Sequence, residues 1–514
     1  MRRLKRVMAL ASLGIGLSLP FGSNSLENIL FTPAYAAENA GDGSNEPGFV
    51  PAPVGKETPA PPANMAGGES FIPYPPPPAA PQSRSEKKNP PEPPKMFTQI
   101  VGGPDSNARP NALNNLLKVL KKEAEVDYAC EFKSWEEISA DPAMNPILYF
   151  SKYNRWSLNT KERDTLREFL IRGGTLILNA GGGSWPAYDS AVKEASLILP
   201  QASVQRLSPD NPIFHSYYEL DKVKASLGKD GTKIIEPRVS GLTIDCRVAI
   251  IIPEFGMDSC SDEFREGIDK VLFPEDAQKL GMNILSYASA NRAYLENLKR
   301  EVVLRDKVVN VSGNLSLVQV MYNGEWKTKD AGLPMLLNEF NRTSGVPVKF
   351  NYDTMKLTDP KIFDSPVLFI TGHEQFSFKP EERKKLSEYL QGGGMLIAEA
   401  CCGRKGFDVS FRREINNLIP GETLRAVSPG DALYHMPNKL GQMSVTPALA
   451  NAMKSPTMNP QLFTLNHNGK NVVLYSPIGE QAGWEVSSSP YSMSYAPSDA
   501  LKLGVNQLLY SMTR

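Results

Sequence analysis

The chain has 514 residues, with 56 basic and 56 acidic side chains and a formal net charge of zero. This length leaves room for two or three domains of ordinary size. Because the charges balance and no basic stripe stands out, the composition excludes a general attraction to nucleic acid or to acidic membrane surfaces.

The N-terminus is predicted to be an export signal. The basic segment MRRLKR precedes an apolar run from Val7 to Leu19, and Ala34-Tyr35-Ala36 offers a small-x-small cleavage site before Ala37. As a helix this run would reach roughly 20 Å, short of the ~30 Å hydrocarbon layer. We therefore expect residues 1–36 to be a signal peptide, with no transmembrane span after cleavage and a periplasmic or envelope location. An uncleaved interfacial anchor is the alternative.

Residues 37–95 are predicted to be a disordered, proline-rich linker. Proline, alanine, glycine and charged residues dominate this segment, and Pro75 to Pro78 are contiguous. Such a composition lacks the apolar side chains that would offset the entropy of ordering. The segment is expected to act as an extended spacer, with a ligand for a partner as the alternative.

The remainder of the chain is a tandem repeat. An ungapped register with an offset of 220 positions holds from Gln99/Gln319 to His215/His435, and the offset grows to 223 at Asp276/Asp499. A register of this length predicts two copies of one domain, at residues 96–300 and 310–514. Positions that both copies share are expected to serve the fold, so the informative residues are those at which the copies differ.

Strands and helices are predicted to alternate within each copy. In the second copy the sequence predicts the strands Leu317–Met321, Val346–Tyr352, Val367–Thr371, Met395–Ala400 and Asn471–Pro477, and the helices Leu333–Thr343, Pro380–Gln391, Val409–Leu418 and Asp499–Met512. The first copy repeats this order from Phe97, with a strand at Arg247–Pro253 and a last helix at Asp276–Leu295. Short apolar runs between amphipathic helices favour an α/β fold with a mostly parallel sheet covered on both faces.

Glycines at Gly173-Gly174 and Gly392–Gly394 follow a helix in each copy. Glycine at this place ends a helix in the left-handed conformation and leads into the next buried strand. A phosphate-binding loop would instead need glycines after a strand and before a helix, so that interpretation is rejected.

Three loops of the second copy follow predicted strands. They are Tyr322–Trp326, Gly372–Glu374 and Cys401–Asp408. In open parallel sheets the ligand site lies beyond the carboxyl ends of the strands. With the common strand order 2-1-3-4-5, the first, third and fourth strands are neighbours and these loops meet.

The Cys401–Asp408 loop carries two thiols and two cations beside a helix predicted to be capped by Asp408. One interpretation is an anion or carbohydrate site in which Arg404, Lys405 and the backbone of Gly403 and Gly406 hold a ligand. Asn323 and Glu374 on the other loops complete that set.

The second interpretation is a nucleophilic Cys401 or Cys402 with His373 as the general base. The first copy has Gly181–Trp185 in place of the thiols and Tyr153 in place of His373, so it is expected to be inert.

Metal binding has weak support from the sequence, and no cofactor or metal is predicted. Adjacent cysteines do not easily reach one tetrahedral ion together, and the chain has no CxxC or HxxxH spacing. Five cysteines cannot all pair within one chain; Cys246 and Cys260 could bridge a hairpin, whereas Cys130 has no obvious partner. His435, which the first copy retains as His215, is interpreted as structural or as part of a site independent of cysteine.

With these residues in place, the second copy resembles the bacterial family known as domain of unknown function 4159. The segments that carry the resemblance are LFITGHEQFSF, GGGMLIAEACCGRKGFD, FRREI and LYHMPNKL. The first copy keeps ILYFSKYNRWSL, RGGTLILNAGGG and IFHSYYEL but departs at the histidine and both cysteines. The family is similar to the class I glutamine amidotransferase-like superfamily, which implies two tandem flavodoxin-like three-layer sandwiches.

The resemblance implies a role in an envelope assembly, but it does not imply glutaminase activity. Amidotransferases place a nucleophile after the strand that Cys401 and Cys402 follow, but they carry a glycine-flanked single cysteine and a late His-x-Glu pair that this chain lacks. Glutaminase activity is therefore not expected. Similar domains occur in exported proteins encoded near MoxR-type ATPases and von Willebrand A-domain proteins, which implies an envelope protein partner. A purely structural envelope component is the remaining alternative, and its sign would be a filled apolar site without a cleft.

Overall fold

The computed structural model describes residues 95–103, 105–106, 110–124, 128–143, 145–258, 270–298, 317–348, 352–416, 418–485 and 489–513. The predicted signal peptide and all of the proline-rich linker except Lys95 lie outside these ranges. Within the described residues, no helix is both long enough and apolar enough to cross a membrane.

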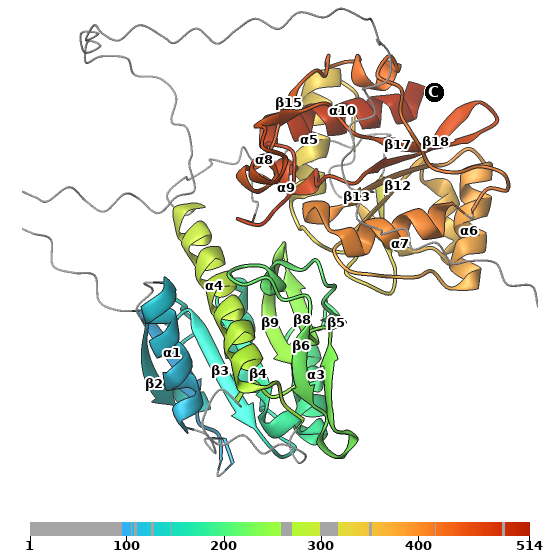
Figure 1. Ribbon diagram of the computed structural model, residues 1–514. Helices are drawn as coiled ribbons and strands as arrows, with labels where there is room; N and C mark the ends of the chain where they lie inside the picture. Colours follow the sequence, from blue (N-terminus) through green and yellow to red (C-terminus); the bar gives the residue numbers. More distant parts are fainter. Residues whose placement is uncertain are drawn as a thin grey trace, which may run out of the picture. The chain divides into compact units, whose positions relative to one another are not determined.

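Each repeat forms one mixed, mostly parallel sheet of seven strands (Figure 1). The first sheet has the order β2-β1-β3-β4-β9-β8-β5 and the second the order β11-β10-β12-β13-β18-β17-β14. In both, the first five strands are parallel to one another, and the last two pairings along the sheet are antiparallel, so only the sixth strand runs against the others. The prediction of an α/β fold with two tandem, mostly parallel sheets is confirmed.

The elements of the first repeat are β1 (Lys95–Ile100), α1 (Pro110–Ala124), β2 (Tyr128–Lys133), β3 (Ile147–Lys152), α2 (Thr160–Ile171), β4 (Thr175–Ala180), α3 (Trp185–Ile198), β5 (Gln205–Arg206), β6 (Val223–Ser226), β7 (Thr232–Ile235), β8 (Val239–Ile244), β9 (Arg247–Pro253) and α4 (Pro274–Leu298). β6 and β7 form a separate two-stranded ribbon. The part of this repeat between Gly228 and Gly241, which shows no clear periodicity in sequence, contains β7 and the start of β8.

The elements of the second repeat are β10 (Leu317–Met321), α5 (Gly332–Ser344), β11 (Asp353–Lys356), β12 (Val367–Gly372), α6 (Pro380–Gln391), β13 (Met395–Ala400), α7 (Lys405–Ile415), β14 (Arg425–Ala426), β15 (Met443–Ser444), α8 (Pro447–Met453), β16 (Thr457–Met458), β17 (Phe463–His467), β18 (Lys470–Ser476), α9 (Gln481–Trp484) and α10 (Pro497–Thr513). Most predicted boundaries agree within a few residues.

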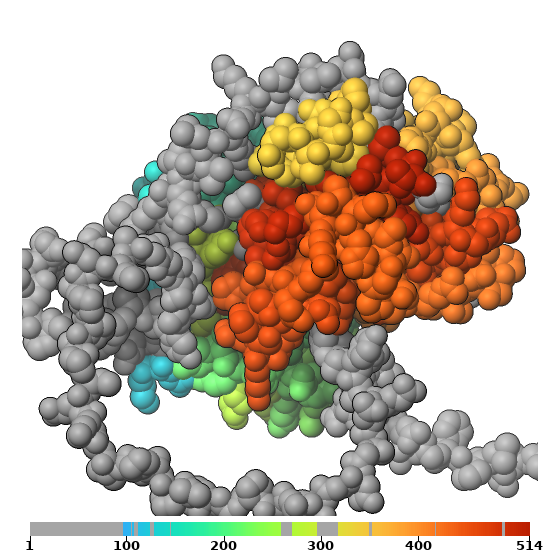
Figure 2. All heavy atoms as spheres, turned by 90° about the horizontal axis from the view of Figure 1, so that it is seen from above, coloured from blue at the N-terminus to red at the C-terminus, as the bar shows by residue number. Residues whose placement is uncertain are grey.

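Alternate residues of the central strands face two separate apolar cores, as the twofold side-chain period of a strand requires. In β12, Val367 and Phe369 pack into the core that contains α5 and α10, whereas Leu368 and Ile370 pack into the core that contains α6 and α7. Figure 2 shows α5 in yellow beside the red C-terminal helix α10. Helices therefore cover both faces of the second sheet.

Two element predictions need correction. The strand predicted at Val346–Tyr352 is displaced: Val348 is buried in the core beside α5, residues 349–351 lie outside the described part, and the strand that pairs with β10 is Asp353–Lys356. This edge strand alternates half-buried and exposed residues, so its apolar signal is weak. α7 begins at Lys405 rather than Val409, and Asp408 lies in its first turn instead of capping it.

The glycine turns behave as predicted. Gly173 and Gly393 have φ angles of 101° and 96°, and they follow α2 and α6. These left-handed angles favour glycine because an L side chain would clash with the backbone.

An ion pair shared by both repeats gives a first prediction about stability. Arg383 Nε lies 2.6 Å from Glu414 Oε2, and the counterparts Arg163 and Glu194 are 2.8 Å apart. Burial by itself would raise the pKa of Glu414, but Arg383 and the Phe378 N–H together hold the pKa of this carboxyl below its ordinary value. Replacing Glu414 with glutamine is expected to lower the free energy of unfolding by about 1–3 kcal/mol at neutral pH, as measured by urea denaturation.

The same pair predicts a pH dependence. Because the folded-state pKa of Glu414 lies below the unfolded value, its stabilising contribution is complete above the unfolded pKa and is lost as the pH falls through the folded pKa. The difference between wild type and Glu414→Gln should therefore shrink in acid. Glu194→Gln is the matched variant in the first repeat, and a difference that stays constant or grows in acid contradicts this account.

Candidate functional site

The carboxyl ends of β10, β12 and β13 lie side by side and bring three polar loops of the second repeat together. β12 pairs with both β10 and β13. His373 follows β12 directly, and Cys401 follows β13. The predicted meeting of these loops therefore occurs, because the strands that precede them are neighbours in one parallel sheet.

The two cysteines lie in a tight turn that the first repeat makes from glycine. Cys402 has a φ angle of 56° and a ψ angle of 19°, and its counterpart Gly182 has 56° and 18°. A non-glycine residue in this left-handed region is uncommon and carries strain. Here the turn brings neighbouring side chains together: the sulfur atoms of Cys401 and Cys402 are 3.9 Å apart.

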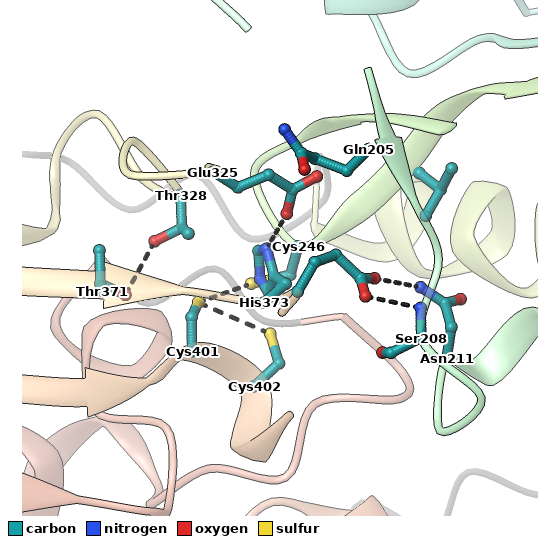
Figure 3. Close-up of polar contacts among 12 residues, drawn as sticks. Gln205, Ser208, Asn211, Cys246, Glu325, Thr328, Thr371, His373, Cys401 and Cys402 are labelled. Carbon is teal, nitrogen blue, oxygen red and sulfur yellow. Dashed lines mark hydrogen bonds and ion pairs between the residues drawn. The ribbon is translucent and has the colours of Figure 1, made fainter. Parts of the chain in front are cut away.

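A third thiol comes from the first repeat. Asp245 and Cys246 form the turn between β8 and β9, and Cys246 Sγ lies 3.6 Å from Cys401 Sγ (Figure 3). The corresponding turn of the second repeat is Asn468-Gly469, which has no thiol. The bridge to Cys260 considered from the sequence involves a residue outside the described part.

His373 completes this group of side chains. Its Nδ1 atom lies 2.9 Å from Glu325 Oε2, while its Nε2 atom is buried and makes no hydrogen bond with the described residues. The sulfur atoms of Cys246, Cys401 and Cys402 and a ring nitrogen of His373 lie within 4.8 Å of one another, and all four residues are buried. We call these four residues the Cys/His cluster.

The cluster is electrostatically coupled. Burial lowers the pKa of His373, but Cys246, Cys402 and Glu325 outweigh this effect and raise the pKa well above its ordinary value. Burial and the neighbouring thiols raise the pKa of Cys401. At Cys402 burial also acts upward, yet the neighbouring thiols and the nearby His373 lower the pKa well below the usual range.

Two buried cations lie near the sulfur atoms. Lys329 and Arg404 are only 3% and 6% exposed, and both interact electrostatically with Cys402. Charged side chains are seldom buried without opposite charge close by. Arg404 was predicted to hold a ligand, but in the structure its side chain is buried.

The Cys401–Asp408 segment lies at the carboxyl edge of the sheet, as predicted, but apart from the exposed Lys405 it is mostly covered instead of open. Cys401 and Cys402 are 0% and 1% exposed. The N–H of Lys405 donates to Asp210 Oδ2 of the first repeat at 2.7 Å, and a Cβ atom on Gly406 would lie 2.9 Å from Ser208 Oγ. The first repeat therefore packs directly on this segment.

Glu374 also joins the two repeats. Its carboxylate accepts hydrogen bonds from the N–H of Ser208 at 2.7 Å and from Asn211 Nδ2 at 3.1 Å. Both hydrogen bonds are buried. Glu374 was predicted to bind a ligand, but each of its carboxylate oxygens accepts a hydrogen bond from the first repeat instead.

A polar cleft opens beside the cluster, with a cavity volume of about 220 Å³. His373 contributes to its wall, but the three cysteines do not. The first repeat provides one side and the loop after β10 provides the other. Its lining residues are Pro200, Gln201, Ala202, Ser203, Thr243, Asp245, Tyr322, Asn323, Gly324, Glu325, Trp326, Lys327, Thr328 and His373.

Glu399, at the end of β13, serves the fold. Its carboxylate accepts hydrogen bonds from the N–H groups of Glu480 and Gln481 and from the hydroxyl of Thr371. Its counterpart Asn179 accepts in the same way from the N–H of Met257. His435 and His215 likewise share one role, since each ring places Nε2 near the carbonyl oxygen of a proline six residues earlier.

The equivalent place in the first repeat is filled. A Cβ atom on Gly181 would lie 2.7 Å from the ring of Tyr153, and the Tyr153 hydroxyl donates to Asp258 Oδ2 at 2.9 Å. Aromatic and carboxylate side chains thus occupy the space that the thiols and imidazole occupy in the second repeat.

Of the residues predicted from the sequence, the structure brings together Cys401, Cys402 and His373, and it places Asn323 in the neighbouring cleft. Gly403, Arg404, Lys405, Gly406 and Glu374 do not line that cleft. Sequence reasoning missed Cys246 and Glu325. A signal for Cys246 was present, because the chain has a cysteine in this hairpin turn where the other copy has the turn residue Gly469.

The fold and the site together define a tandem α/β protein with one buried thiol and imidazole cluster at the contact between its repeats. The chain belongs to the family described as "Domain of unknown function (DUF4159)", whose sequence profile matches residues 97–289 and 316–512. A search of curated proteins gives no match.

Three solved structures are distantly similar to this chain. An α-L-fucosidase isoenzyme 2 from Paenibacillus thiaminolyticus is 13% identical over 41% of this chain and 29% of its own, with a TM-score of 0.16. A putative phosphosugar isomerase from Silicibacter pomeroyi is 10% identical, covering 59% of this chain and 74% of its own, with a TM-score of 0.15. A β-galactosidase variant from G. stearothermophilus is 12% identical, covering 65% of this chain and 50% of its own, with a TM-score of 0.16. The chain thus spans less than a third of the fucosidase.

Proposed function

We propose that this protein is an exported binding module of the cell envelope that receives a small polyhydroxylated ligand, of the carbohydrate class, in the cleft beside His373. The observation that carries the proposal is the polar cavity of about 220 Å³ at the carboxyl edge of the second sheet. Ligand sites of α/β proteins gather at this edge. A purely structural component would have a filled, apolar surface at this place.

The lining of the cleft favours a neutral polyol over an anion. Asp245 and Glu325 provide carboxylates, which accept hydrogen bonds from hydroxyl groups and repel anions. Lys327 is the lysine of the lining, and its ammonium group already lies 2.6 Å from Asp330. Trp326 adds an aromatic surface beside these polar groups, a combination that suits a small ligand with apolar and hydroxylated faces.

The cleft can be tested by binding measurements on the whole exported chain. We expect calorimetry with a panel of mono- and oligosaccharides to find a ligand whose affinity falls roughly tenfold in Asn323→Ala, because one direct hydrogen bond is worth about 1.4 kcal/mol. Asn323 is exposed, so the variant should fold. Trp185→Ala is the control, since Trp185 is exposed on the first repeat and does not line the cleft. Equal affinity in Asn323→Ala and wild type argues against this cleft as the site.

The fold is proposed to be a flavodoxin-like variant related to the amidotransferase-like superfamily. Support comes from the five parallel strands in the order β11-β10-β12-β13-β18 and from the cysteines directly after β13. Export is proposed from the N-terminal sequence alone. N-terminal sequencing of the mature protein from fractionated cells is expected to begin at Ala37, and an intact Met1 in a cytoplasmic fraction contradicts export.

A thiol-dependent hydrolase that uses Cys401 or Cys402 with His373 is the second candidate. The contact between the imidazole and the thiols favours it. The burial of both sulfur atoms and their absence from the cleft lining weigh against it, because a nucleophile must touch its substrate. A thiol-reactive probe applied at graded pH distinguishes the two candidates: labelling of wild type above that of free cysteine, lost in Cys402→Ser, supports the hydrolase.

A further inference from the structure

The Cys/His cluster has the donor set and the spacing of a tetrahedral metal site. Zinc bound by thiolates at about 2.3 Å requires neighbouring sulfur atoms to lie roughly 3.8 Å apart. The separations from Cys401 to Cys246 and to Cys402 are 3.6 and 3.9 Å, and the four donor atoms all fall within 4.8 Å of one another. Packed thiols without a metal can have similar separations. The position of the His373 imidazole is therefore the observation that distinguishes a metal site from simple packing.

His373 is prepared as a metal ligand. Its Nδ1 atom contacts the Glu325 carboxylate, so the ring can keep one proton on that side while Nε2 gives its lone pair to a cation. Nε2 is buried and makes no hydrogen bond within the described residues, although three sulfur atoms surround it. A carboxylate behind the histidine is the arrangement that orients imidazole ligands toward zinc.

The backbone of Cys402 is in a strained conformation that brings the sulfur atoms of the Cys/His cluster together. Cys402 adopts the left-handed conformation that its counterpart Gly182 adopts without a side chain. A cysteine here costs stability, and its conformation is what brings two adjacent sulfur atoms to one point. The objection that neighbouring cysteines cannot share an ion fails for this turn.

The charges around the cluster also fit a bound ion. Zinc with three thiolates and a neutral imidazole carries a net charge of about −1. Lys329 and Arg404 are buried and interact with Cys402, so they would balance that charge. Binding releases to solvent the protons that the thiols and the Nε2 atom of His373 carry, and no electron is transferred.

We propose that Cys246, Cys401, Cys402 and His373 bind one Zn²⁺ ion as a closed structural site that fastens the first repeat to the second. Four protein ligands leave no open position for substrate, which is typical of a structural site. Neither repeat supplies the set alone: the second has Gly469 where the first has Cys246, and the first has Tyr153, Gly181 and Gly182 at the other three places. The cleft proposed above shares His373 with this site but does not depend on the ion.

Metal analysis of the whole chain tests the proposal. Protein purified with a reductant and without added chelator is expected to contain about one zinc per chain by mass spectrometry of the elements. Cys246→Ser and His373→Ala should each lose most of this zinc. Cys130→Ser is the matched control, because Cys130 is half-buried in β2 of the first repeat and is not part of the cluster. Loss of zinc in the control but not in Cys246→Ser overturns the assignment.

A second measurement avoids dependence on variants that fold poorly. Replacing zinc with Co²⁺ in the wild-type chain should give a thiolate-to-cobalt charge-transfer band and the visible bands of tetrahedral geometry. Octahedral cobalt bands, zinc far below one per chain after reconstitution, or a disulfide between Cys246 and Cys401 in the protein isolated from cells each overturn the proposal. Preferential retention of copper or iron also overturns it.

Discussion

Replacing Glu374 with alanine is expected to lower the free energy of unfolding by about 3 kcal/mol, because two buried hydrogen bonds to a charged acceptor are lost. The Ser208 N–H and the Asn211 amide would both remain buried without their acceptor. Since these donors belong to the first repeat, the change should also weaken the contact between the repeats. Urea denaturation monitored by circular dichroism measures the loss, and a separate early transition would report loosening of one repeat.

The same position in the first repeat provides the control. Asn154 is the counterpart of Glu374 and is exposed, and among the contacts that the structure describes it bonds only to the half-buried Asp105. Asn154→Ala should therefore change stability by less than about 0.5 kcal/mol. Glu374→Gln should fall between wild type and alanine because the amide keeps one acceptor oxygen. A Glu374→Ala chain as stable as Asn154→Ala would show that this buried carboxylate does not hold the repeats together.

Removing zinc is expected to produce the largest loss of thermal stability. An ion that binds only the folded chain stabilises it by about 4 kcal/mol when its free concentration is roughly 1,000 times its dissociation constant. For units of about 200 residues, each kcal/mol shifts the unfolding midpoint by about 2–4 °C, so chelation should lower the midpoint by about 8–16 °C. Calorimetry at graded free zinc measures this dependence.

Cys246→Ser gives the internal control for that experiment. Its midpoint should lie near that of the zinc-free wild type and should no longer respond to added zinc. Because Cys246 belongs to the first repeat, its loss should also separate the unfolding of the two repeats. A wild-type midpoint that does not change with zinc concentration would contradict a structural ion at the cluster.

Much of the fold followed from local sequence. β10, α6 and β13 lie at the predicted residues, because each is a short apolar run or an amphipathic helix bounded by turn residues. The left-handed Gly173 and Gly393 were also predictable, since a glycine at the end of a helix has few other uses. The start of α7 was missed because Arg404 occupies its N-cap position without a side-chain cap hydrogen bond, and arginine carries no capping signal in sequence.

The site was predicted only in part. Cys401, Cys402 and His373 could be placed together because they end neighbouring parallel strands. Cys246 could not, since it lies 155 residues before Cys401 and reaches it only through the packing of one repeat on the other. The geometry of the two adjacent thiols depends on the positive φ angle of Cys402. The sequence alone does not predict this angle, because cysteine seldom adopts it; the only hint is that the first copy has a glycine, Gly182, at this position.

By itself, the amino-acid sequence determined that this protein is a tandem α/β repeat and that one copy carries thiols and an imidazole at its strand ends. Both conclusions come from patterns along the chain: the periodicity of apolar residues and the alignment of the two copies. Tertiary structure alone decided that the Cys401–Asp408 segment is covered, that Arg404 is buried, and that a third thiol joins the cluster. These features arise from contacts between distant parts of the chain. Burial by another repeat does not produce a periodic pattern of apolar residues in the segment that it covers, so the sequence does not predict it.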